Sequence, residues 1–141
     1  FRERAAAEKL RLTRDMLFRG QDMIQFDPKR FGTHLETYRY TLPNGWWGDP
    51  VSRKYGRSDV ASEIVAADVA VTAAPPAEIA AQVGRLFQSP VEGDRVRFPG
   101  KQVRFVPAAG RAGLVALDFK ATDPSAAGRV ERICNMEFRL V

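Results

Sequence analysis

The sequence predicts an α+β protein built from repeated βαβββ-type modules with curved antiparallel sheets. Two stretches about 48 residues apart share an apolar strand pattern, then a proline, then a helical stripe, and such a fixed-period repeat indicates a modular architecture. The repeating unit is short and rich in hairpin signals, which favours antiparallel pairing over a parallel, doubly wound sheet. The matching positions are Val69 with Leu117, Val71 with Phe119, and Pro76 with Pro124.

Residues 1–59 are predicted to form an incomplete module that lacks its first strand. Apolar residues at helical spacing predict a helix over 2–18, and Gly20 is expected to end it. Alternating apolar residues and turn signals predict the elements that follow. These are a strand over 22–26, a turn at 27–30, a strand over 33–41, and a loop over 43–59 that is rich in Gly, Pro and aromatic residues.

Residues 60–110 are predicted to form a module with a strand, a helix and a hairpin. The stretch 64–73 is apolar with strand-like alternation, and a pair of prolines ends it. Pro76 suits the first turn of a helix, where proline is tolerated. The stripe of this helix consists of Ile79, Ala80, Val83, Leu86 and Phe87. Two short strands then follow, over 95–98 and 102–106, joined by a Pro99-Gly100 turn.

Residues 111–141 are predicted to begin a further module with a strand and a helix. The strand covers 114–121, and Asp123-Pro124-Ser125 is expected to open the helix. Its stripe would consist of Ala127, Val130, Ile133 and Cys134. Cys134 is the only cysteine, so no disulfide can form within the chain, and its place on the stripe predicts a buried structural thiol.

The composition is that of an ordinary globular protein, with 45% hydrophobic and 28% charged residues among 141. No run approaches the roughly 20 apolar residues of a membrane span, and residues 1–19 are too charged for a signal peptide. We therefore expect a cytoplasmic protein without a membrane partner. The net charge is +5, but the basic residues are scattered singly, so we expect no nucleic-acid partner.

The stretch 33–41 holds the most suggestive polar residues. His34 is the only histidine, and the alternation of strand side chains puts His34, Glu36, Tyr38 and Tyr40 on one face. A histidine and a carboxylate two positions apart can contribute to a cation site, or they are simply polar residues on a strand. The tyrosines either donate to a bound oxyanion or pack. Trp46 and Trp47 in the loop that follows either wall a ligand pocket or anchor the core.

Three stretches resemble the vicinal-oxygen-chelate superfamily, which contains glyoxalase, bleomycin-resistance and dioxygenase proteins. LVALDFKATDPSAAGRVERI at 114–133 resembles the opening of a module, with a strand, an aspartate-containing turn and a helix. RVRFPGKQVRFVP at 95–107 resembles the following hairpin. FDPKRFGTHLETY at 26–38 is similar to the module ending, where a turn leads into a strand carrying an inward glutamate. Together they imply a glyoxalase-like fold.

The resemblance also implies a metal site. Paired modules of the family form a cup, in which first-strand residues, often histidines, and a last-strand glutamate hold a divalent metal that acts as a Lewis acid. Glu36 matches that glutamate, and His34 would be a second ligand or proton carrier. However, alanine stands where the family often places histidine, at Ala67 and Ala116. The expected cofactor is therefore either one divalent ion (Zn, Fe, Mn, Mg or Ni) or none.

Three functional hypotheses follow from these residues. The first is a metal-dependent lyase, isomerase or dioxygenase that acts on a small oxygenated organic molecule, with Glu36, His34 and Tyr38 as catalytic residues. The second is a metal-free binding or resistance-type protein of the same fold, with walls formed by Trp46, Trp47 and the two tyrosines at 38 and 40. The third is a structural or oligomerising module without a ligand. In each case we expect a homodimer, or completion by further modules of a longer chain.

Overall fold

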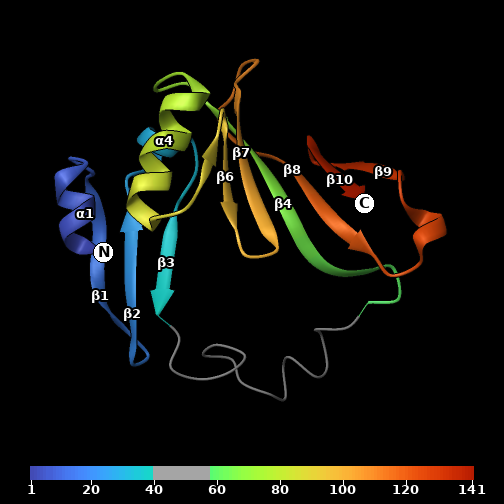
Figure 1. Cartoon of the computed structure of the whole chain (residues 1–141), viewed down its shortest axis with the longest axis horizontal. Helices are drawn as coiled ribbons and strands as arrows, with labels where there is room; N and C mark the ends of the chain where they lie inside the picture. Colours follow the sequence, from blue (N-terminus) through green and yellow to red (C-terminus); the bar gives the residue numbers. More distant parts are fainter. Residues whose placement is uncertain (40–57) are drawn as a thin grey trace.

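The computed structural model describes residues 1–39 and 58–141, and it confirms an α+β protein made mostly of strands (Figure 1). The described residues form two sheets. One has three antiparallel strands in the order β1-β2-β3, and the other has seven strands in the order β5-β6-β7-β4-β8-β10-β9. Tyr40, Trp46 and Trp47 lie outside the described residues.

The three-stranded sheet replaces most of the predicted N-terminal helix. Helix α1 covers only Arg2–Ala7, and β1 (Leu12–Phe18) then pairs with β2 (Gln21–Phe26). Arg19 and Gly20 connect these strands with φ of 50° and 76°, values that suit a tight hairpin. The helix prediction over 9–18 was therefore wrong, because the glycine expected to end a helix turns a hairpin and cross-strand pairing overrides the helical spacing.

A single helical turn connects β2 to β3. The expected turn at 27–30 is the short helix α2 (Pro28–Phe31), whose first turn is capped by the Asp27 side chain accepting from the Lys29 amide. Strand β3 is Glu36–Arg39, so the predicted strand begins later than expected. His34 consequently precedes β3 instead of sharing its alternation.

The strands and the helix predicted over 60–110 are present almost as expected. Strand β4 (Ala61–Val71) leads into α4 (Pro76–Phe87), which has proline in its first turn. Strands β5 (Val91–Glu92), β6 (Arg95–Phe98) and β7 (Lys101–Pro107) follow as an antiparallel meander. Strand β7 then returns beside β4 and runs parallel to it. The expected strands and helix are thus confirmed, with their ends shifted by a few residues.

The C-terminal segment departs from the predicted repeat. Strand β8 (Gly113–Ala121) is confirmed and pairs antiparallel with β4. The predicted helix is wrong: a 3₁₀ turn, η1 (Pro124–Ala126), leads instead to a hairpin of β9 (Val130–Ile133) and β10 (Met136–Leu140). Gly128, with φ of 90°, is incompatible with a continuing helix. Cys134 occupies the hairpin turn and is exposed, so its expected burial is also wrong.

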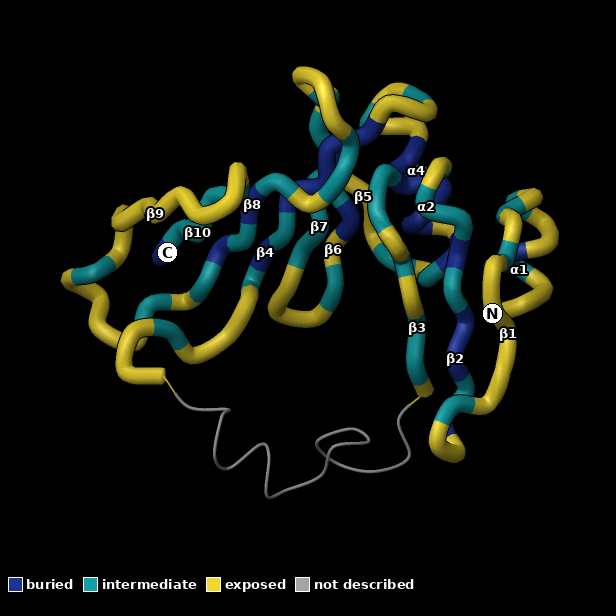
Figure 2. Tube along the Cα trace, turned by 180° about the vertical axis from the view of Figure 1, so that it is seen from behind, coloured by how far each residue is buried: buried dark blue, intermediate teal, exposed yellow. Residues whose placement is uncertain are grey.

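Helix α4 lies between the small sheet and one face of the large sheet, and its apolar side joins them into one core (Figures 1 and 2). Ile79 and Leu86 of α4 are fully buried. The core also takes side chains from both sheets and from α1 and α2; its other buried members are Ala5, Ile24, Phe26, Phe31, Val69, Val71, Ala80, Val83, Val96 and Phe105. No described helix is long and apolar enough to cross a bilayer.

Gly32, at the end of α2, lies close against the backbone of β4. It has φ of 74°, and a Cβ there would collide with the Ala70 carbonyl oxygen of β4. We predict that Gly32→Ala destabilises the protein by roughly 2–4 kcal/mol, because left-handed strain and overpacking add. Gly20→Ala is the matched control: its φ is 76° but its Cβ would meet open space, so only the strain of about 1 kcal/mol applies. Equal losses in urea unfolding would contradict the packing argument.

Candidate functional site

One face of the seven-stranded sheet carries aligned rows of polar side chains. Strand register puts residues from neighbouring strands side by side, and alternation keeps them on the face opposite the one that α4 covers. We call this the polar face. One row consists of Arg95, Arg104, Asp68, Ala116, Glu137 and Arg132. The next row consists of Arg97, Gln102, Ala66, Asp118, Arg139 and Val130.

Two aspartates and two arginines form an ionic network at the centre of the polar face. Asp68 on β4 and Asp118 on β8 are 7% and 6% exposed. The Nε of Arg104 donates to Asp68, and its Nη2 donates to Asp118 at 2.8 Å. The Nη1 of Arg139 also reaches both carboxylates, at 2.8 Å to Asp68 and 3.3 Å to Asp118. Each buried carboxylate therefore has two guanidinium partners, which is what burial of a charge requires.

Glu137 extends the network along β10. It accepts from Arg139 Nη2 at 2.8 Å and from Arg132 Nη2 at 2.5 Å, and these hydrogen bonds lower the pKa of Glu137. Hydrogen bonds to Asp68 and Glu137 raise the pKa of Arg139. Burial alone would lower the pKa of Arg104, but its bonds to the two aspartates raise it overall. The hydrogen bonds of the network thus favour the charged forms of Glu137, Arg104 and Arg139.

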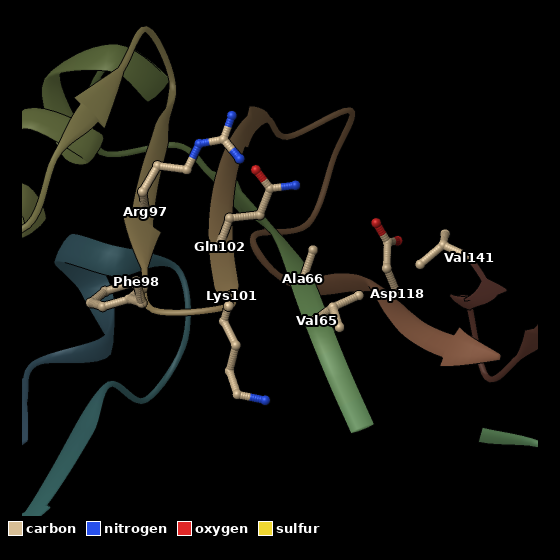
Figure 3. Close-up of a pocket in the computed structure, with 9 residues that line it drawn as sticks. Val65, Ala66, Arg97, Phe98, Lys101, Gln102, Asp118 and Val141 are labelled. Atoms are coloured by element: carbon tan, nitrogen blue, oxygen red, sulfur yellow. The ribbon is translucent and has the colours of Figure 1, made fainter. Parts of the chain in front are cut away.

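Two hollows lie on either side of this network. The first hollow, of about 460 Å³, is lined by Val65, Ala66, Arg97, Phe98, Gly100, Lys101, Gln102, Asp118 and Val141 (Figure 3). The second hollow, of about 730 Å³, is lined by Asp68, Val106, Val115, Arg132, Cys134, Asn135, Met136, Glu137 and Arg139. Both volumes fall in the range of small-molecule sites. Ala66 leaves room above the sheet at the first hollow, because its side chain ends at Cβ.

Gln102 carries an unsatisfied polar atom at the first hollow. Its Oε1 is buried and finds no hydrogen-bond partner among the described residues. Figure 3 shows Gln102 and Arg97 directed to the same side, with the short Ala66 side chain between Gln102 and Asp118. Buried polar atoms are nearly always paired, so this oxygen is an exception among the described residues, and its lack of exposed surface keeps a molecule in the hollow from reaching it.

The structure brings together only some of the site residues predicted from sequence. Glu36 accepts from Tyr38 Oη at 3.0 Å and from Gln25 Nε2 at 2.5 Å. His34 is exposed and lines a separate hollow of about 530 Å³, which includes Cys134 and Asn135 but not Glu36.

These residues do not fit a preformed metal site. Both oxygens of Glu36 already accept hydrogen bonds, and no group of three His, Cys, Asp or Glu side chains in residues 1–39 and 58–141 is arranged to hold an ion. Asp68 and Asp118 are bonded to arginines instead. Of the two alanines at which the resemblance would place metal-ligating histidines, Ala116 lies on the polar face beside Asp68, whereas Ala67 pairs with Leu117 on the opposite face. The metal ligands therefore remain a prediction.

The lowered pKa of Glu137 predicts a pH-dependent part of the stability. Because its folded-state pKa lies below the unfolded value, its contribution is complete above about pH 4.5 and is lost as pH falls through the folded-state pKa. We expect Glu137→Gln to destabilise the protein at pH 7 and to lose that effect once the pH falls below the folded-state pKa. Glu131→Gln on β9 changes the net charge equally and is the control. A pH-independent gap between wild type and Glu137→Gln in urea unfolding would contradict this.

Sequence reasoning missed the central network because its members come from four strands that only folding brings together. A local signal did exist. Asp68 stands between Ala66 and Ala70 in the otherwise apolar stretch 64–73, and Asp118 interrupts the apolar stretch 113–119 of β8 in the same way. A lone charge on a buried strand implies a partner on a neighbouring strand.

The polar face and its hollows are thus defined by strand register and side-chain chemistry. Compared with known protein families, curated proteins and solved structures, the chain gave no match.

Proposed function

We propose that this chain is a small-molecule-binding protein of the glyoxalase-like type, which binds its ligand on the polar face without a divalent metal. The observation that carries the proposal is the bridging of Asp68 and Asp118 by Arg104 and Arg139. Two guanidinium groups occupy the space between carboxylates that could otherwise coordinate an ion, and hollows of ligand size adjoin them.

The order of elements supports the glyoxalase-like assignment. The path β4–α4–β5–β6–β7 is one strand, one helix and three strands, with the last strand parallel to the first. The path β8–η1–β9–β10 repeats this with fewer elements, and its last strand is again parallel to its first. The first strands of the two units, β4 and β8, lie side by side. This order of elements supports the paired-module arrangement that the sequence resemblance implies.

The residues on these strands favour the metal-free binding protein over the metal-dependent enzyme. In the family, first strands and a last-strand glutamate supply the metal ligands. Here the first strands present Asp68 and Asp118 to the polar face, but the last strand of the β4–β7 unit presents Gln102 and Arg104. A cationic arginine at this place neutralises the aspartates as a metal ion would, so the donor set supports binding more than Lewis-acid catalysis.

A blocking variant tests whether the ligand binds on the polar face. Ala66 is 3% exposed and lines the first hollow, so Ala66→Leu would fill part of that space. We expect small neutral and charged aromatic fragments, screened by ligand-observed NMR in EDTA, to bind the wild type and to lose binding to Ala66→Leu. Ala61→Leu, on the same strand outside the hollow, should bind as the wild type does. Absence of binding, or binding equal in all three folded proteins, would contradict the proposal.

The enzyme hypothesis remains a second candidate, because Tyr38 and Glu36 form one hydrogen-bonded pair. A carboxylate and a phenol in contact can handle a proton, with His34 as the expected second metal ligand. Elemental analysis of the purified chain distinguishes the two candidates. Stoichiometric divalent metal that is lost in both His34→Ala and Glu36→Ala would support the enzyme, whereas metal-free protein that still binds fragments would support the binding protein.

A further inference from the structure

We infer that an apolar face of the C-terminal strands binds a second copy of this chain, so that the protein forms a reversible dimer. This surface, the uncovered face, consists of Ile64, Leu117, Phe119, Ile133 and Phe138, and it lies on the side of the large sheet opposite the polar face. The inference goes beyond the proposed function, because ligand binding on the polar face does not require it.

The strand register places the uncovered face on the side of the sheet that α4 covers elsewhere. Ala67, on the α4 side of β4, pairs with Leu117 of β8, and Leu117 pairs with Phe138 of β10. Phe119 and Phe138 stack with their ring centroids 6.0 Å apart. The pairing of β9 with β10, together with the alternation of strand side chains, puts Ile133 on the same side. The apolar surface of the large sheet therefore continues from β4 across β8 and β10 to β9.

The helix that buries this surface in the β4–β7 unit has no counterpart in the β8–β10 unit. Helix α4 packs on β5, β6 and β7, and Val69 and Val71 of β4 are buried in the same core. The 3₁₀ turn η1 stands in the place of a second helix, and Figures 1 and 2 show α4 beside β6 and β7, away from β8, β9 and β10. Ile64 and Ile133 are consequently 45% and 58% exposed. A contiguous exposed apolar patch of this kind marks an interaction surface.

The charges beside the uncovered face favour a second copy as its occupant. Arg129 and Glu131 of β9 lie on the same side of the sheet as Phe138, and Arg129 Nε donates to Glu131 at 2.9 Å. Both side chains are more than half exposed, so they can exchange partners at little cost. A twofold axis through the face allows Arg129 of each copy to lie opposite Glu131 of the other, which makes the surface self-complementary.

The shape and size of the uncovered face set the kind of association expected. Two sheet faces pack on each other with interdigitating side chains, as in β-sandwiches. A lipid surface would select an excess of basic residues, whereas the β9 rim carries both signs. A standard interface uses about 20–30 residues on each side, and the uncovered face offers fewer. We therefore expect a dimer that dissociates in the micromolar range.

Two substitutions on β9 test which face makes the contact. Sedimentation velocity of the whole chain over a concentration series measures the dimer, with a reducing agent to prevent a disulfide through the exposed Cys134. Ile133→Glu is expected to weaken the dimer about tenfold or more, because it would bury an unpaired carboxylate against apolar side chains. Val130→Glu is the matched control: Val130 is 50% exposed on the same strand but belongs to the polar face, so the dimer should be unchanged. Thermal melts establish that both variants are folded.

Charge reversal tests whether the partner is a second copy. Glu131→Arg places like charges opposite each other across the twofold axis and is expected to weaken the dimer roughly threefold. Adding Arg129→Glu to this variant restores opposite charges and should restore the dimer. In a mixture of isotope-labelled and unlabelled wild-type copies, intermolecular NOEs from the methyl groups of Leu117 and Ile133 should locate the contact without any substitution.

Three results would overturn the inference. The first is a wild type that stays monomeric up to the millimolar range. The second is a dimer that Val130→Glu disrupts and Ile133→Glu does not, since the contact would then be made by the β9 edge or the polar face. The third is a set of NOEs that joins the Leu117 and Ile133 methyl groups only to residues of the same copy, since the chain itself would then cover the face. Because the fragment titrations probe the opposite face, each of these results leaves the proposed function standing.

Discussion

Asp68→Ala is expected to lower the free energy of unfolding by about 3 kcal/mol. The change removes the carboxylate that holds both Arg104 and Arg139, and it leaves two guanidiniums facing one remaining aspartate. Breaking a buried ion pair from one side costs roughly 3–5 kcal/mol. We expect the low end of this range, because the arginine side chains are 22% and 30% exposed and water reaches them in part. Urea unfolding at pH 7 measures the loss.

Two comparisons make this result specific to the network. Glu92→Ala removes the partner of Arg97 in a pair whose side chains are 57% and 45% exposed, so it should change the stability far less than Asp68→Ala does. In a double-mutant cycle, Asp68→Ala and Arg104→Ala should be far from additive, because the second change no longer breaks an intact pair. Additive losses would contradict the network as a unit.

Phe26→Ala is expected to cost about 3–5 kcal/mol, which places it with the largest single effects in this molecule. Phe26 on β2 is 0% exposed and packs edge-to-face against Phe1 at 6.0 Å and Phe31 at 5.9 Å between ring centroids. Removing the ring leaves a cavity where the small sheet meets the shared core. Calorimetry should show a lower melting temperature and a single transition.

Leu17→Ala on the neighbouring strand is the control for this change. Leu17 is 68% exposed, so removing its side chain should change stability by about 0.5 kcal/mol or less. Two separate transitions in Phe26→Ala would show that the small sheet unfolds on its own, contrary to a core shared through α4.

The elements predicted correctly are those in which the local sequence pattern and the packing of the folded chain favour the same secondary structure. The stretch 60–110 is the best example: alternation in β4, proline at the start of α4 and the Pro99-Gly100 turn all specify the observed structure. The stripe expected for α4 contains its buried hydrophobic residues Ile79, Ala80, Val83 and Leu86. In this helix the apolar spacing in the sequence and the burial in the structure select the same side.

Both wrong helices have a common physical cause. In 9–18 and in 127–134, apolar residues recur at helical spacing, but a residue with positive φ turns each segment into a hairpin. Exposed strands such as β1 and β9 show no clean alternation because neither face is fully buried. Spacing alone cannot then separate strand from helix. The repeat thus predicted the shared strands and prolines correctly and the second helix incorrectly.

Less of the candidate site than of the fold could be predicted from the sequence. Glu36 and Tyr38 are in contact, as the strand pattern implied, but His34 precedes the strand and faces a different hollow. The network of Asp68, Asp118 and their arginines depends on the register between β4, β7, β8 and β10. Parallel pairing of β4 with β7 and of β8 with β10 brings together residues far apart in the chain, and no local pattern encodes that pairing.

The most direct test of metal-free binding on the polar face is an amide NMR titration of the whole chain with the small fragments, once in EDTA and once with added Zn²⁺. We predict that the largest shift changes fall on β4, β7, β8 and β10, around Asp68, Gln102 and Asp118, and that they are the same in both conditions. Shift changes that appear only with Zn²⁺, or that gather around His34 and Glu36, would contradict it.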